Sequence, residues 1–210
     1  MEQYIFKETE WYLLTSNIID VSDVNKIFYN KSVVLVGNSE NLLANKYGYL
    51  IDDYDVVCRI NRGIENTIHN PISAGSKTDI LFYSMCRVDI IPLKIEKNIT
   101  CIQTTTKYSN FRLNNDTHFY NDNTSLKTKL NLPKKKIPST GITAIDIINN
   151  AQPKKFGIYG FDFKKTPTYY HDTEEYKKLH PVQKSKHLWE QEENFVINLT
   201  KEFSNITLYQ

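Results

Sequence analysis

Three polar turns are the parts of the sequence best suited to hold a small anionic or sugar-like ligand. Gly37-Asn38-Ser39 follows a short apolar run at 33–36, and Asn61 ends another at 55–60. Ser139-Thr140-Gly141 precedes a stretch of helical pattern. Backbone N–H groups at a glycine turn or a helix start bind phosphate or carboxylate, and asparagine side chains both donate and accept hydrogen bonds. Taken singly, each turn is equally consistent with an ordinary strand-to-helix connection or a helix cap.

Two segments nearer the C-terminus carry groups that can move protons. His187 opens an apolar-periodic stretch at 187–203, and Glu192 follows five residues later. An unperturbed histidine pKa of about 6.5 suits a general base. The segment Tyr169-Tyr170-His171 offers phenols and an imidazole, which can donate hydrogen bonds to developing negative charge. For His187 the alternative is a surface histidine that begins a helix. For Tyr169-Tyr170-His171 the alternative is an aromatic loop packed on the surface.

The composition narrows the class of protein. A length of 210 residues predicts one domain, with residues 1–30 as a lead-in and 104–137 as a mobile loop or insertion. The formal net charge of +2 does not indicate a nucleic-acid binder. Three cysteines do not form a disulfide framework, and neither a signal-peptide core nor a membrane-spanning run is present, so we expect a cytoplasmic protein. Lysine runs would suit peripheral contact with an anionic membrane face or glycan, or would simply be solvated.

Short apolar runs alternate with helical patterns along the chain. Such runs, rich in β-branched residues, are typical of strands buried on both faces of a parallel sheet. Ligands of open α/β sheets bind at the carboxyl ends of the strands, where the polar turns would meet. We therefore predict an α/β fold: a single Rossmann-like domain with a mostly parallel central sheet flanked by helices. The expected strands are 33–36, 55–60, 79–83, 99–103, 156–161 and 207–209, and the expected helices are 40–50, 142–150 and 187–203.

Four segments in a fixed order resemble the motifs of the sialyltransferases, glycosyltransferase family 29. Residues 33–75 are similar to the large sialyl motif, and residues 138–161, with Pro-Ser-Thr-Gly and Tyr-Gly-Phe, to the small motif. Tyr169-Tyr170-His171-Asp172 is similar to motif III, and His187-Leu-Trp-Glu-Gln-Glu192 to motif VS. Each motif is modest alone, and the ordered set is specific.

The resemblance implies a sialyltransferase-type variant of the GT-A fold and an inverting transfer that needs no metal or other cofactor. The donor would be CMP-sialic acid, or secondly CMP-Kdo, and the acceptor a glycan or glycolipid hydroxyl. His187 would be the general base with support from Glu192, while Tyr169, Tyr170 and His171 would meet the departing phosphate. The donor would be held by Gly37, Asn38, Ser39, Asn61, Ser139, Thr140 and Gly141, with Gly160 and Phe161 at the cytidine end.

The sequence also departs from the animal enzymes. Those enzymes pair a cysteine of the large motif with one of the small motif, whereas Ser32 precedes Val33 here and no cysteine lies near Asn149 or Asn150. The resemblance is therefore to a compact microbial or viral relative. Two alternatives stay open: a non-catalytic nucleotide-binding module, and another Rossmann-like transferase such as a methyltransferase.

Overall fold

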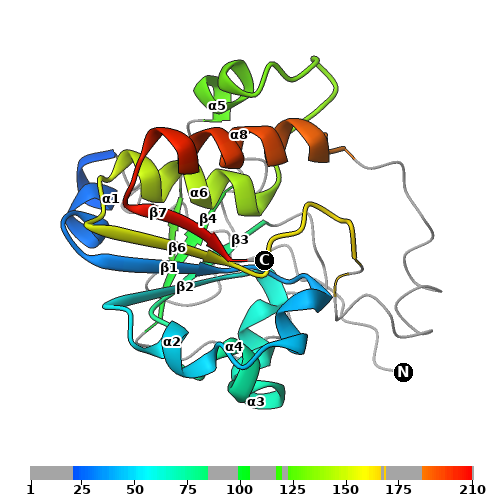
Figure 1. Cartoon of the computed structure of the whole chain (residues 1–210). Helices are drawn as coiled ribbons and strands as arrows, with labels where there is room; N and C mark the ends of the chain where they lie inside the picture. The colour runs from blue at the N-terminus through cyan, green and yellow to red at the C-terminus, as the bar shows by residue number, and fades with distance from the viewer. Residues whose placement is uncertain are drawn as a thin grey trace, which may run out of the picture.

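A seven-stranded sheet forms the centre of the molecule (Figure 1). The computed structural model describes residues 21–84, 99–104, 117–119, 123–166, 168 and 186–209. The strand order is β5-β4-β3-β2-β1-β6-β7, and every neighbouring pair is parallel, which confirms the predicted α/β class. The strands are β1 (Ser32–Val36), β2 (Val56–Ile60), β3 (Ile80–Tyr83), β4 (Thr100–Gln103), β5 (Thr117–Phe119), β6 (Lys155–Tyr159) and β7 (Ile206–Tyr209).

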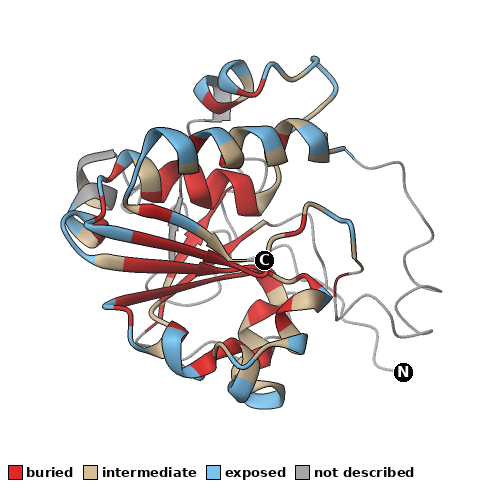
Figure 2. Cartoon of the chain, viewed as in Figure 1, coloured by how far each residue is buried: buried red, intermediate tan, exposed pale blue. Residues whose placement is uncertain are grey.

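Helices cover both faces of this sheet. Alternation along β1 explains why both faces are apolar: Val33 and Leu35 belong to one buried cluster, and Val34 and Val36 to the other. Figure 2 shows β1, β2 and β6 buried over most of their length. The first face is covered by α1 (Val21–Phe28), α6 (Thr140–Asn150) and α8 (Trp189–Glu202), with α5 (Asn123–Lys129) beside them; the second is covered by η1 (Glu40–Ala44), α2 (Gly48–Asp52), η2 (Asn61–Glu65), α3 (Asn66–His69) and α4 (Pro71–Ala74).

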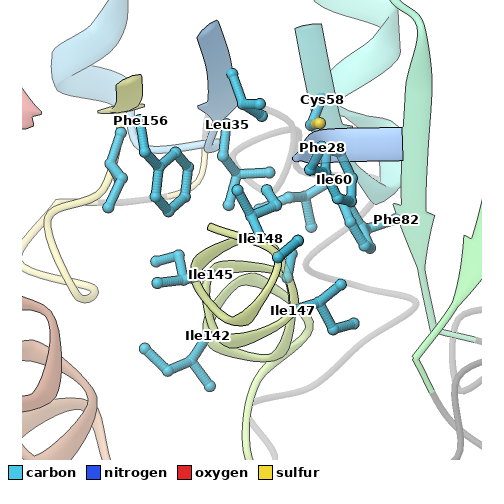
Figure 3. Close-up of a cluster of buried hydrophobic side chains, with 14 of the residues drawn as sticks. Phe28, Leu35, Cys58, Ile60, Phe82, Ile142, Ile145, Ile147, Ile148 and Phe156 are labelled. Carbon is cyan, nitrogen blue, oxygen red and sulfur yellow. The ribbon is translucent and has the colours of Figure 1, made fainter. Parts of the chain in front are cut away.

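Helix α6 is the central helix of the first face. Ser139 caps its start, because the side-chain oxygen accepts a hydrogen bond from the Ile142 N–H at 3.2 Å. Most of its residues are buried, and Figure 3 shows Ile145 and Ile148 directed towards the strands. Each buried isoleucine contributes roughly 1.5–3 kcal/mol. The helix therefore has little freedom to shift, and its N-terminus lies fixed at the carboxyl edge of the sheet.

The second face is held by polar bonds within residues 52–78. Arg59 is fully buried in β2 and donates hydrogen bonds to the carbonyl oxygens of Ala74 and Lys77. The Asp52 carboxylate accepts hydrogen bonds from the backbone N–H groups of Ser76 and Lys77. Much of the predicted large-motif segment therefore serves the scaffold.

Three predicted segments differ in detail from the structure. The helix expected over 40–50 is instead the short 3₁₀ helix η1 followed by α2, and the two are separated at residues 45–47. Gly48 begins α2 so close to α4 that an added Cβ would lie 2.1 Å from the Pro71 carbonyl oxygen. The interval 1–30 includes α1, and the interval 104–137 includes β5 and α5. No helix in the described part of the chain is long and apolar enough to cross a membrane.

Candidate active site

The first two strands end side by side at the carboxyl edge of the sheet. The Asn38 side-chain amide donates to the carbonyl oxygen of Ile60 at 3.0 Å, which is the last residue of β2. Asn61 follows directly, with a φ of 49°, and its side-chain oxygen accepts a hydrogen bond from the Ser84 N–H at 3.1 Å. Asparagine tolerates this left-handed conformation better than most residues. The structure therefore brings Asn38 and Asn61 together at one edge, as the sequence predicted.

The glycine at position 37 is required by the protein's own packing. Its N–H donates to the Tyr159 carbonyl at 2.7 Å, which ties the end of β1 to the end of β6. A Cβ added at Gly37 would lie 2.3 Å from the Gly160 carbonyl oxygen and 2.7 Å from the Phe161 ring. Protein atoms therefore already fill the space that a side chain at this position would need.

Phe161 connects the first turn to the start of α6. A Cβ added at Gly141 would lie 2.7 Å from the other side of the Phe161 ring. The ring is therefore packed between two glycine positions that are more than 100 residues apart in the sequence. Gly160, with a φ of 67°, makes the turn that places it. Phe161 thus shapes this edge of the sheet by packing against both turns.

Ser39 is committed to contacts within the protein. It is buried, its N–H donates to the Gly160 carbonyl at 3.1 Å, and its hydroxyl bonds to the Asn41 side chain. An isolated antiparallel bridge also pairs Ser39 with Thr168. Asp162, on the same loop, accepts hydrogen bonds from the N–H groups of Lys164 and Thr166. The loop after β6 is thereby held over the end of β1.

His187 is oriented by a backbone carbonyl. Its Nδ1 lies 2.9 Å from the carbonyl oxygen of Ile137. A carbonyl can only accept, so Nδ1 carries the hydrogen, and in the neutral ring Nε2 is the basic nitrogen. The Ile137 N–H in turn donates to the Lys186 carbonyl at 3.0 Å. Sequence reasoning did not find Ile137, because a backbone acceptor leaves no mark on residue type.

Positive charge surrounds this histidine. Burial lowers the pKa of His187, and the Ile137 hydrogen bond acts in the opposite direction. Like-charge repulsion from three ammonium groups lowers this pKa further; these groups belong to Lys136, Lys164 and Lys186. They come from three separate segments, before α6, after β6 and before α8. A neutral, basic imidazole in a cationic setting suits proton removal beside an anionic substrate.

Glu192 is hydrogen-bonded to Ser139, the residue that caps α6. Its two carboxylate oxygens accept from the Ser139 N–H at 2.8 Å and from the Ser139 hydroxyl at 2.6 Å. In the part of the chain that the structure describes, no hydrogen bond joins Glu192 to His187. Burial raises the pKa of Glu192 to about 7, although the two bonds from Ser139 oppose this shift.

The start of α6 is therefore partly occupied by protein groups. Ser139 is engaged by Glu192 and by the N–H of Ile142, so Thr140 and Gly141 are the remaining predicted donor-binding positions at this helix start. Tyr169, Tyr170 and His171 lie outside the described residues. Among the residues that are described, no group of three or more His, Cys, Asp or Glu side chains could hold a metal ion.

One protein-family model matches the first part of the sequence. The sequence profile described as glycosyltransferase family 29 (sialyltransferase) matches residues 13–91, a stretch that contains β1, β2 and β3. Well under half of the chain thus matches a sialyltransferase family model. This match supports the family resemblance read from the motifs. No curated protein sequence matches the chain.

Solved sialyltransferase structures share the fold of this chain. A mammalian sialyltransferase in complex with Gal-beta-1-3GalNAc-ortho-nitrophenol matches with a TM-score of 0.68 at 17% identity, over 92% of this chain and 74% of that one. The sialyltransferase CstII from Campylobacter jejuni, in complex with the substrate analogue CMP-3FNeuAc, matches with a TM-score of 0.59 at 17% identity, over 85% and 81% of the two chains. An apo alpha-2,3-sialyltransferase from the same organism matches with a TM-score of 0.53 at 17% identity, over 92% and 77%.

Proposed function

We propose that this chain is a sialyltransferase, which moves sialic acid from CMP-sialic acid to a glycan hydroxyl with inversion and without a metal. One observation carries the catalytic part: the hydrogen bond from His187 Nδ1 to the Ile137 carbonyl, which makes Nε2 the basic nitrogen. The structurally similar CstII binds a CMP-sialic acid analogue, and the similar mammalian enzyme binds a galactose-containing acceptor. These ligands suggest the donor and acceptor classes for this chain.

In the proposed reaction, His187 Nε2 removes the proton of the acceptor hydroxyl as its oxygen attacks the anomeric carbon. The bond between that carbon and the CMP phosphate oxygen breaks, and CMP leaves with the electron pair. Attack from the face opposite the leaving group inverts the anomeric centre. The ammonium groups near His187 would stabilise the negative charge that develops on the phosphate.

The donor would lie across the carboxyl edge of the sheet. Asn38 and Asn61 end the two central strands there, and the unengaged predicted positions Thr140 and Gly141 begin the 11-residue helix α6. The N–H groups of a helix start favour phosphate or carboxylate. Because CMP-sialic acid and CMP-Kdo both carry a phosphate and an anomeric carboxylate, this site would accept either class.

Ligand binding tests the proposal directly. In a thermal-shift and calorimetric screen without added metal, CMP should stabilise the protein, whereas UDP, GDP and S-adenosylmethionine should not. CMP at 100 times its Kd would contribute about 2.7 kcal/mol. Stabilisation by S-adenosylmethionine with none by CMP would instead favour a methyltransferase. If CMP binds, turnover of CMP-sialic acid and CMP-Kdo then decides the donor, and binding without turnover of either would indicate a binding module.

Chelation tests the metal-free mechanism. Transfer should continue at an unchanged rate in excess EDTA, because the lysine ammonium groups supply the positive charge that a divalent ion would otherwise provide at the phosphate. The measurement is the initial rate of CMP release with and without chelator. Loss of the rate on chelation, and its recovery on addition of Mg²⁺ or Mn²⁺, would show that this part of the proposal is wrong.

A further inference from the structure

The start of α8 and the segment 137–139 are joined by four hydrogen bonds. The Ile137 carbonyl accepts from His187 Nδ1, and the Ile137 N–H donates to the Lys186 carbonyl. Two residues further along, the Ser139 N–H and hydroxyl both donate to Glu192. The segment 137–139 therefore carries at one end the carbonyl that accepts the hydrogen bond of the proposed base, His187. At its other end it carries Ser139, which caps α6.

Glu192 makes the side-chain contacts that fix the second end of this segment. Its side chain is only 2% exposed, and its oxygens lie 2.6 and 2.8 Å from the two Ser139 donors. Above its pKa of about 7 the carboxylate is ionised, and hydrogen bonds to an ionised carboxylate are roughly twice as strong as neutral ones. The Ser139 hydroxyl, which also accepts from Ile142 N, is thereby held in one orientation.

We propose that Glu192 is a positioning residue: by holding Ser139, it sets both the orientation of His187 and the placement of the donor-binding start of α6. The proposal rests on the proposed function, because it assigns the base and the donor turn as above. Among the described residues no hydrogen bond joins Glu192 to His187, so its effect would pass through the backbone from Ser139 to Ile137.

The alternative is that Glu192 only joins two helices and stabilises the fold. The two interpretations differ in what happens to the ring of His187. If the segment 137–139 moves, the Ile137 carbonyl no longer holds Nδ1–H, and the neutral ring should shift towards the Nε2–H form that free histidine prefers. A contact that served stability alone would leave this proton where it is.

The experiment compares E192A, E192Q and the control E190A, which changes an exposed glutamate of the same helical turn. The ring nitrogens of ¹⁵N-histidine-labelled protein report the tautomer, and the His187 signals are assigned by their absence from H187A. Steady-state kinetics give kcat and the KM for the CMP-sugar donor. The NMR arm uses no substrate, so it still tests the positioning role if the proposed donor is wrong.

In E192A we expect His187 to lose its Nδ1–H form and the donor KM to rise. We also expect kcat to fall about 100-fold, which is the typical cost of a displacement of about 1 Å at a reacting group. E192Q, whose amide can still bond Ser139, should restore the tautomer and most of the rate, and E190A should match the wild type. Retention of the wild-type tautomer and kcat in a folded E192A protein would overturn the proposal. If E192A does not fold, S139A decides. This variant removes the hydroxyl contact to Glu192 and the cap bond to the Ile142 N–H but keeps the backbone contact to Glu192. An unaltered His187 tautomer and an unaltered donor KM would overturn the proposal equally.

Discussion

Replacement of His187 by alanine should lower the turnover of sialyl transfer by about 10²- to 10⁴-fold, the usual contribution of a general base. Donor binding should persist, because the predicted donor contacts at Asn38, Asn61 and the start of α6 do not involve the imidazole. The measurements are kcat from CMP release and the Kd of CMP from calorimetry. The combination of lost turnover and retained binding is the result expected of a catalytic group.

His69 supplies the matched control for this substitution. It lies on the exposed surface of α3, on the face of the sheet opposite α6 and α8. H69A should keep the wild-type kcat and the wild-type Kd for CMP. Unchanged turnover in H187A would exclude the histidine as the base, and loss of CMP binding in the same variant would show that the ring is needed to build the donor site.

Replacement of Gly37 by alanine should both destabilise the fold and abolish nucleotide binding. The new methyl group would lie 2.3 Å from the Gly160 carbonyl oxygen, which cannot retreat easily because it accepts the Ser39 N–H. Overpacking of this kind typically costs about 1–3 kcal/mol, and sometimes more. To relieve the clash between the methyl group and this oxygen, the end of β1 would have to move away from the loop after β6. Chemical denaturation gives the free energy of unfolding, and calorimetry the affinity for CMP.

Gly157→Ala separates loss of stability from loss of the site. A Cβ at Gly157 would lie 2.4 Å from the Tyr54 hydroxyl, within β6 and away from the strand ends. This variant should lose stability, yet bind CMP as the wild type does while it is folded. Normal CMP binding by G37A would contradict the view that the packed β1 turn shapes the donor site. The double variant G37A/F161A should remain impaired, because it removes the ring but leaves the Gly160 carbonyl.

The fold could be predicted from the sequence wherever local pattern and burial agree. The run Val33 to Val36 is a strand buried on both faces, as its uninterrupted apolar, mostly β-branched composition predicts. The helix at 142–150 was similarly clear, because its isoleucines, Ser139 cap and following Pro153 all mark it. By contrast, residues 40–50 have helical spacing, but the close approach of Gly48 to Pro71 imposes a break that no local pattern reveals.

The candidate site was predictable as a set of positions and not as a set of contacts. The strand ends at Asn38 and Asn61 follow from parallel topology alone. The hydrogen-bond partner of Glu192 could not be predicted in this way. Ser139 lies 53 residues away in the sequence, and the sequence does not tell which residue the carboxylate meets. The acceptor of His187 is a main-chain oxygen, which any residue type would supply. Motif order thus names the residues, and tertiary packing decides which of them meet.

The central position of β1 has a consequence for synthesis of the chain. Strands β1, β2 and β3 leave the ribosome within the first 83 residues, but β6, which pairs with the other side of β1, ends at Tyr159. Helix α6, which packs against β1 and β3 on one face of that half-sheet, is completed only at residue 150. A nascent half-sheet would thus present an open strand edge and an apolar face until the second half emerges, a state prone to aggregation. Because the candidate site draws on both halves, the catalytic apparatus is assembled last.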